Sequence, residues 1–245
     1  MMKNLKKLYL QQVKLPESDT FKDIIPTSVF SATTRCTAVR SAAAAAFNKA
    51  VRETFAEKAT LVGAFRECLD TGTMPEVSDE YDPAKIKKAA ELLLNSKAAG
   101  GETRIKPKFV LSDGFFQILT GSVDFAVREN GDLTLVKLSK AKTAAADELS
   151  VLIYVLLAFC SMYKETAIVF KKIPVIKDGG KDEVFRLEKS DMTEPPEVTL
   201  KRILSSLVEV QRDKGPDCAT CIHAPYCTVL AKQLEQEVAD AADRD

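Results

Sequence analysis

The sequence contains very little histidine, the residue that supplies imidazole groups for catalysis and metal binding. Its 245 residues include no Trp and a single His, His223. One imidazole argues against sites that need several, such as His-rich zinc catalysis, HEXXH metalloprotease motifs and His-based triads. An excess of one charge is also lacking, because 35 Lys and Arg residues balance 35 Asp and Glu residues. The basic footprint of a typical nucleic-acid-binding chain is therefore absent, and any basic surface must be local.

Long hydrophobic runs are missing as well. The longest, Val151 to Cys160, is about half of the roughly 20 residues that span a bilayer, so it predicts a buried helix. The basic N-terminal stretch has no apolar segment of signal-peptide length. We therefore expect a cytoplasmic protein, or an intracellular viral or plasmid product, without a membrane partner. In such a chain the six Cys favour thiols or metal ligation over disulfides.

The order of predicted elements indicates an α/β fold. With 46% hydrophobic and 29% charged residues, the chain can bury a substantial core. Ala-rich segments bounded by turn residues predict helices, and runs of β-branched and aromatic residues predict strands. Asn130-Gly131 predicts a hairpin. We expect an irregular arm at 1–28, helices at 31–69, 85–97, 143–163 and 197–212, strands at 109–111, 115–127, 133–138 and 167–170, and a second hairpin turning at 177–182. Asp82-Pro83 is the predicted start of the helix that covers 85–97.

Three cysteines near the C-terminus form the sharpest local signal. Cys218, Cys221 and Cys227 make a C-x2-C-x5-C run after a helix-ending Gly-Pro. Two thiolates separated by two residues can turn onto one ion, and the Pro-containing spacer brings the third within reach. The clustering predicts a metal or cluster site.

The fourth ligand has several candidates. His223 is near in sequence but cramped, because it follows Cys221 by only two residues. Cys36 is remote and lies in a polar segment, whereas Cys68 and Cys160 lie in apolar helical stretches that suit small core residues. Cys36 is the favoured ligand. Four thiolates suit either a 4Fe-4S cluster or zinc.

The remote Cys36, the α/β core and the trailing three cysteines together resemble the iron-sulfur PD-(D/E)XK nucleases. These are the RecB/AddB-like and CRISPR-adaptation-type exonucleases, in which one Cys precedes the nuclease core and three follow it. The resemblance implies a restriction-endonuclease-like mixed sheet flanked by helices, a helical N-terminal part and a C-terminal Cys-rich cap. It also implies a single domain over 29–230, between the arm and an acidic tail at 231–245.

The centre of the chain has the motif spacing of that family's core strands, but most of the family's catalytic residues are replaced. Gly121-Ser-Val-Asp124 fits the family's first core strand, and the stretch from Val136 to Thr143 fits the next one. The family's second acidic ligand falls on Lys137, its catalytic lysine on Ser139, and a helix Gln that precedes Tyr154 on Ser150.

These replacements matter because the family's site holds a divalent ion, Mg²⁺ or Mn²⁺, on two carboxylates. Asp124 remains as a vestigial ligand, and the Lys137 ammonium would repel the ion. Glu67 and Lys140 are the residues that could replace the missing carboxylate and lysine. Metal is expected only if activity survives through such a relocated site.

We therefore expect a nuclease-derived, DNA-associated pseudoenzyme with nuclease activity lost or weakened. Its partner would be DNA, single-stranded or at ends, bound near Lys137, Lys140 and Lys142, together with a protein of a DNA-processing complex. One alternative is an active metal-dependent exonuclease that uses Asp124, Glu67 and Lys140. The other is a zinc-stabilised interaction module with no nucleic-acid role.

Overall fold

The computed structural model describes residues 2–16, 25–26, 50–112, 117–129, 131–140, 148–161 and 165–208. Cys36, Cys218, Cys221 and Cys227 lie outside these ranges, as do His223 and Lys142. The fold is α/β, built around a mixed six-stranded sheet with the strand order β1-β9-β8-β7-β6-β3.

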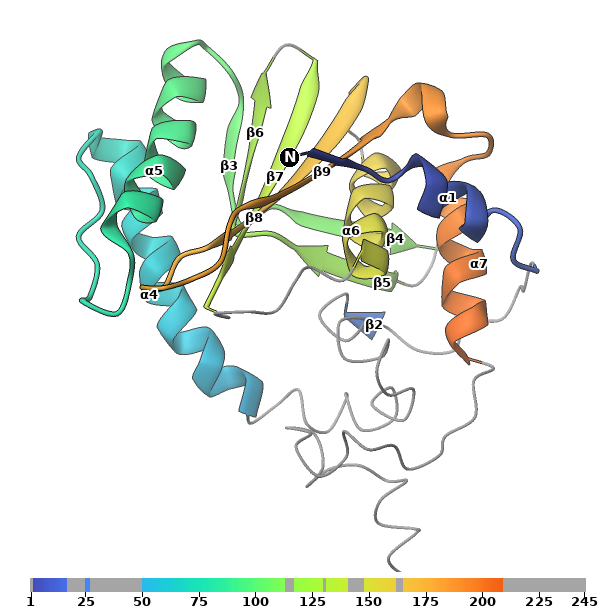
Figure 1. Cartoon of the computed structure of the whole chain (residues 1–245), viewed down its shortest axis with the longest axis horizontal. Coiled ribbons are helices and arrows are strands. Elements are labelled where there is room, and N and C mark those ends of the chain that lie inside the picture. The colour runs from blue at the N-terminus through green and yellow to red at the C-terminus, as the bar shows by residue number, and fades with distance from the viewer. Residues whose placement is uncertain are drawn as a thin grey trace, which may run out of the picture.

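Within the described residues a second, three-stranded sheet has the order β2-β5-β4, and helices lie on both sides of the main sheet (Figure 1). The strands are β1 (Met2–Asn4), β2 (Ile25–Pro26), β3 (Thr103–Ile105), β4 (Lys108–Ser112), β5 (Gln117–Ser122), β6 (Phe125–Glu129), β7 (Asp132–Ser139), β8 (Ala167–Pro174) and β9 (Glu183–Glu188). The helices are α1 (Lys6–Gln12), α4 (Ala50–Thr71), α5 (Pro83–Ala98), α6 (Glu148–Cys160) and α7 (Pro196–Val208), with a 3-10 turn at Lys189–Asp191.

The predicted helix and hairpin signals are confirmed where the structure describes them. Asp82 caps α5 by accepting hydrogen bonds from the backbone N–H groups of Ala84 and Lys85, as expected for an Asp placed before a Pro at the first helical position. Gly131 has a φ of 83° in the turn between β6 and β7, a conformation that favours glycine. The second hairpin is also present, since β8 and β9 pair antiparallel.

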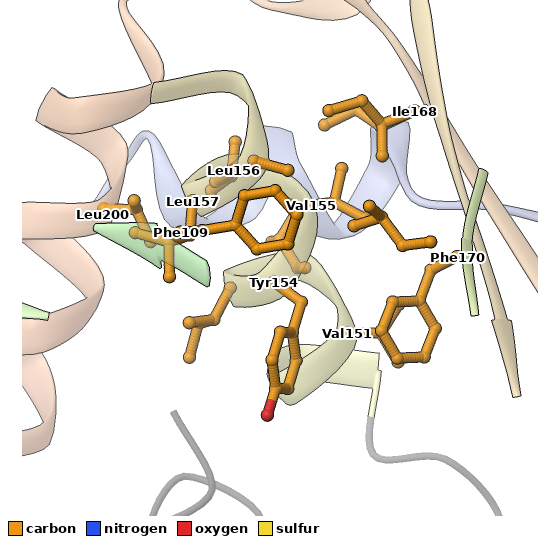
Figure 2. Packing of buried hydrophobic residues seen from close by; sticks show 14 of the residues in the cluster. Phe109, Val151, Tyr154, Val155, Leu156, Leu157, Ile168, Phe170 and Leu200 are labelled. Atoms are coloured by element: carbon orange, nitrogen blue, oxygen red, sulfur yellow. The ribbon is translucent and has the colours of Figure 1, made fainter. Parts of the chain in front are cut away.

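The two faces of the main sheet carry separate hydrophobic cores. Alternation along β7 places Leu133 and Leu135 against α6 and Val136 and Leu138 against α4 and α5. On the α6 side, nearly every residue of that helix is buried, which explains its unbroken apolar sequence. Figure 2 shows this cluster, in which Phe109 of β4 and Phe170 of β8 approach the helix from different sides.

A bend in one hairpin connects the two sheets. β3 pairs with β6 in the main sheet. The chain continues from β3 into β4, and β5 leads into β6; β4 and β5 pair with each other in the second sheet. Lys106 lies at the bend with a φ of 49°, and its N–H donates to the Asp124 carbonyl at 2.9 Å. The expected strand 115–127 is therefore two strands, because the backbone leaves the main sheet at Val123 and Asp124.

The prediction of an irregular N-terminal arm is wrong for residues 2–12. β1 pairs parallel with β9, and α1 follows it immediately. Leu5 and Tyr9 are buried in the α6-side core, and the Tyr9 hydroxyl accepts from the backbone N–H groups of Thr193 and Glu194. The segment is too short to show a clear hydrophobic period, and its strand forms only because β9 provides a partner.

Candidate functional site

Asp124 lies where β6 separates from β7. Its backbone N–H donates to the Val136 carbonyl at 3.0 Å, and its carboxylate Oδ2 accepts from the Leu138 N–H at 2.7 Å. The residue is 7% exposed. Because the backbone of β6 no longer pairs with β7 beyond this point, the carboxylate supplies the acceptor for the next strand N–H. Asp124 thus has a structural role that does not require a metal.

Lys137 points toward the same place from β7. Its Nζ donates to the Ser122 carbonyl at 3.2 Å and lies 5.6 Å from the centre of the Tyr154 ring. Burial acts to lower the pKa of Lys137, but attraction to Tyr154 and Asp124 and a hydrogen bond with Tyr154 outweigh it and raise the pKa. Lys137 is therefore a fixed cation at neutral pH.

The positions that the resemblance aligns lie on β7 and α6, and one residue from each of these elements is in contact with the other. Tyr154 of α6 contacts Lys137 and packs against Phe170, with ring centroids 5.7 Å apart. Figure 2 shows its hydroxyl directed away from the packed side chains. Ser150 lies one helical turn earlier and is 8% exposed, and Ser139 lies two residues after Lys137, so on the same face of β7.

A neighbouring lysine was not identified from the sequence. Lys172 of β8 is the register partner of Lys137, and its Nζ lies 3.9 Å from Glu183 of β9. Burial lowers the pKa of Lys172, with Glu183 opposing that shift. Lys171 and Lys172 directly follow the strand predicted at 167–170, and the sequence does not give the register that places Lys172 beside Lys137.

The same side of the sheet carries a chain of ion pairs beyond Lys172. Lys3 of β1 lies 3.4 Å from Glu183 and 3.5 Å from Glu148, the first residue of α6. The N-terminal end of α6 thus lies at the same end of the sheet as Lys172. Both pairs include half-exposed side chains, so they contribute little to stability.

Glu67 lies on α4, and Lys140 directly follows β7. Glu67 is exposed on α4, whose core face consists of Leu61, Phe65 and Cys68. The Lys140 Nζ lies 3.1 Å from Glu80 and 5.1 Å from the centre of the Tyr81 ring. A hydrogen bond from Lys140 holds the pKa of Glu80 below its usual value.

The Lys140–Glu80 pair adjoins a shallow hollow of about 390 Å³ that includes Glu80 and Tyr81 in its lining. The predicted roles of Glu67 and Lys140 beside Asp124 stay predictions. Within the described ranges, no group of three or more His, Cys, Asp or Glu side chains is placed to hold a metal ion.

The two described cysteines are free thiols. Cys68 is buried, as expected of a core residue, and burial raises its pKa. Cys160 is half-buried at the end of α6, where burial, with a smaller contribution from Glu197, raises its pKa to about 12. The raised pKa values disfavour the thiolate form of both residues.

Comparisons with known proteins are sparse. No protein-family model matches the chain, and no curated protein matches it. A solved structure described as the crystal structure of SSO0001 is similar at 13% identity and a TM-score of 0.38, over 92% of this chain and 94% of that one. A likeness at this level does not establish a shared fold. In the part of the chain that the structure describes, no helix has the length and apolarity to cross a membrane.

Proposed function

We propose that this chain is a nuclease-derived, DNA-associated protein of the RecB-like PD-(D/E)XK type, with nuclease activity lost or much weakened. One observation carries the proposal. The Lys137 ammonium lies close enough to Asp124 to be stabilised by its charge, at the position where the resemblance requires a second carboxylate. A divalent ion beside Asp124 would meet this cation, whose repulsion disfavours binding.

The surroundings of Asp124 support the same conclusion. One of its oxygens accepts from Leu138, and Tyr154 approaches Lys137 from α6. A lysine that makes these contacts belongs to the local structure, and a metal could enter only by displacing it. A restriction-endonuclease-like core is part of the proposal, supported by the mixed sheet and by the contact between the aligned strand and helix.

The proposal includes a 4Fe-4S cluster on Cys36, Cys218, Cys221 and Cys227. These residues lie outside the described ranges, so the support comes from their spacing in the sequence. Such a cluster would tie the segment before α4 to the segment after α7. Anaerobically purified protein should contain iron and acid-labile sulfide and lose both in the Cys221→Ala variant. Bound zinc and a colourless protein would instead support the zinc-module alternative.

The proposed loss of nuclease activity is tested on the wild-type protein and on a variant in which the two replaced active-site residue types are restored. Wild-type protein should degrade neither single- nor double-stranded labelled DNA in Mg²⁺ or Mn²⁺. The Lys137→Glu, Ser139→Lys double variant restores the two missing side-chain types, and we expect it to bind Mn²⁺ more tightly than wild type, as measured by calorimetry. Lys171→Glu is the matched control, because it adds a carboxylate to the neighbouring strand on the opposite face.

A clear result would overturn the proposal. Metal-dependent DNA degradation by the wild-type chain that disappears in Asp124→Ala would show an active exonuclease with a relocated site. The Glu67→Gln and Lys140→Gln variants would then test whether those residues complete it. Failure of wild-type protein to bind any DNA, with or without metal, would remove the DNA-associated part of the proposal.

A further inference from the structure

A hollow of about 390 Å³ lies between α4 and the segment that connects α4 to α5. Its apolar lining comes from Leu61 and Ala64, one turn apart on α4, and from Val77 and Tyr81 of the connecting segment. That segment runs along the margin of the molecule in Figure 1. Ligand sites in proteins have volumes of about 300–1,000 Å³, so this hollow suits one or two side chains and is too small for a large cofactor.

The wall that includes Tyr81 is held in place by the residues that follow β8. Tyr81 forms an isolated backbone bridge with Ile176, and the N–H of Asp82 donates to the Val175 carbonyl at 2.8 Å. These bonds fix one side of the hollow before any ligand arrives. A preformed wall lowers the entropic cost of binding.

The polar part of the lining is acidic. It consists of Glu76, Ser78 and Glu80, and among the described residues the lining includes no basic side chain. Lys140 reaches Glu80 from the end of β7, with its Nζ 3.1 Å from the carboxylate and 5.1 Å from the centre of the Tyr81 ring. The fold thus already places one organic cation against this carboxylate and this ring. One ammonium does not neutralise two carboxylates, so the hollow keeps an excess of negative charge.

We propose that this hollow receives an arginine side chain from a protein partner. The inference goes beyond the proposed function, because it assigns a protein-docking site on the α4 and α5 side of the sheet and does not depend on DNA binding. The methylene stem of an arginine covers apolar surface while its charged end stays in water. The planar guanidinium can bind a carboxylate through two hydrogen bonds and stack on an aromatic ring. Exposed Glu76 offers the carboxylate, and Tyr81 offers the ring.

Apolar surface beside the hollow favours a protein over a small cation. Met74 of the same connecting segment is 45% exposed, and it is one of two large hydrophobic side chains exposed among the described residues. Methionine and tyrosine are enriched in protein interfaces, as is the arginine that we place here. A small cation would fill the hollow and leave Met74 uncovered, whereas a peptide whose arginine enters the hollow can cover both.

The test is an NMR titration of the full chain with the dipeptide N-acetyl-Leu-Arg-amide. The amide resonances of Ala64, Val77 and Tyr81 should shift as the dipeptide is added. Glu76→Gln should weaken binding about two- to fivefold, the effect of one exposed ion pair. Asp79→Asn is the matched control, because it removes an exposed charge from the same segment but not from the lining. It should leave the affinity unchanged.

Two further variants act from the other sides of the hollow. Lys140→Gln removes the ammonium that lies against Glu80 and the Tyr81 ring, so the dipeptide should bind severalfold more tightly. Ala64→Phe fills the hollow from α4 and should abolish the shifts. Thermal unfolding verifies that each variant is folded.

Several outcomes would overturn the proposal. The absence of shifts in the lining resonances would do so, and equal weakening by Glu76→Gln and Asp79→Asn would show only a general charge effect. Equal binding of N-acetyl-Leu-Glu-amide would exclude a cation site, and equal binding of N-acetyl-Leu-Lys-amide would remove the assignment to arginine. If ethylguanidinium alone binds as tightly as the dipeptide, the hollow serves a small cation and the docking assignment fails.

Discussion

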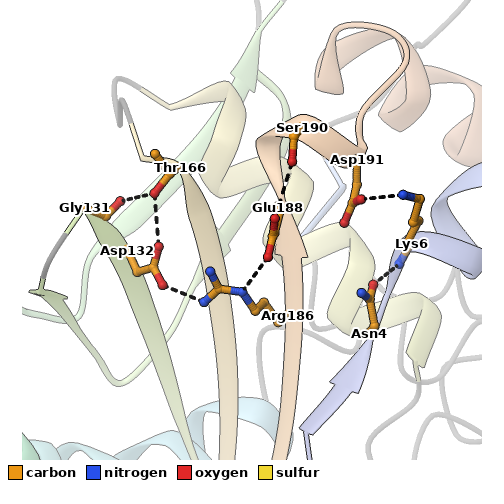
Figure 3. Close-up of polar contacts among 9 residues, drawn as sticks. All are labelled: Asn4, Lys6, Gly131, Asp132, Thr166, Arg186, Glu188, Ser190 and Asp191. Atoms are coloured by element: carbon orange, nitrogen blue, oxygen red, sulfur yellow. Dashed lines mark hydrogen bonds and ion pairs between the residues drawn. The ribbon is translucent and has the colours of Figure 1, made fainter.

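The two ends of the central sheet use charge in different ways. At one end, shown in Figure 3, Arg186 of β9 reaches across β8 to Asp132 at the start of β7, at 2.5 Å, and also contacts Glu188. Thr166 joins this network by donating to the Gly131 carbonyl. Each charge there has an opposite charge beside it. The network links β9 to the start of β7 across β8.

The other end lies five residues further along β7, about 17 Å away at the rise of a strand. There Lys137 and Lys172 are register partners on one face, and their acidic neighbours lie to the outside. Two ends made of the same strands thus differ in their charged residues: an arginine joins two carboxylates at one end, and two lysines, each with an acidic neighbour, are register partners at the other. The arginine network lies away from the residues that the proposed function assigns to DNA, whereas the lysine end includes one of them, Lys137.

The largest expected effect is on the strand that connects the two ends. Leu135 is fully buried in the centre of β7. Leu135→Ala should lower the free energy of unfolding by about 2–5 kcal/mol through lost burial and a residual cavity, as measured by urea denaturation. Thr134→Ala, at the half-buried neighbouring position, should cost much less. Equal losses in the two variants would contradict the two-face packing.

The next effect concerns the bend beside the lysine pair. Asp124→Ala leaves the buried Leu138 N–H without its acceptor and should cost about 1–3 kcal/mol in urea denaturation. Asp124→Asn keeps a side-chain oxygen that can accept the same hydrogen bond, so it should cost less. An Asp124→Ala variant as stable as wild type would mean that the carboxylate does not support β7.

A smaller effect compares the two ends directly. Arg186→Gln removes a partly exposed ion pair and should lower stability by up to about 1 kcal/mol, less at high salt, while DNA affinity stays unchanged. Lys137→Gln removes a cation that the proposed function places beside DNA and should weaken DNA binding. Should Arg186→Gln weaken DNA binding as much as Lys137→Gln, the functional distinction between the ends would be wrong.

The smallest effect involves Cys160, at the end of α6 away from Glu148. The unfolded thiol ionises near pH 9, whereas burial raises the folded pKa to about 12. Between these values the unfolded state binds fewer protons, so the contribution of Cys160 to stability is complete below about pH 9 and is lost as the pH rises toward 12. Cys160→Ala should flatten this alkaline decline in urea unfolding measured at a series of pH values. Identical slopes would show that the thiol titrates alike in both states.

Much of the local structure could be predicted from the sequence. The Asp82-Pro83 start of α5, the hairpin turn at Gly131 and the apolar run of α6 each depend on neighbouring residues alone, and all three are confirmed. The β1 strand could not be predicted, because three exposed residues form a strand only beside β9. The split of the expected strand at Val123 and Asp124 escaped prediction for a similar reason: the bend depends on Lys106 of another segment.

The candidate site divides in the same way. Sequence alone determined the α/β class, the single histidine, the C-x2-C-x5-C spacing and the presence of Lys137 in place of an acid. These are properties of residue identity and of short-range order. Only the tertiary structure decided that Asp124 accepts from Leu138, that Lys140 pairs with Glu80, and that Lys172 lies beside Lys137. The physical reason is register: parallel strands joined through a helix align by packing their faces, and no local pattern in either strand records which residues become neighbours.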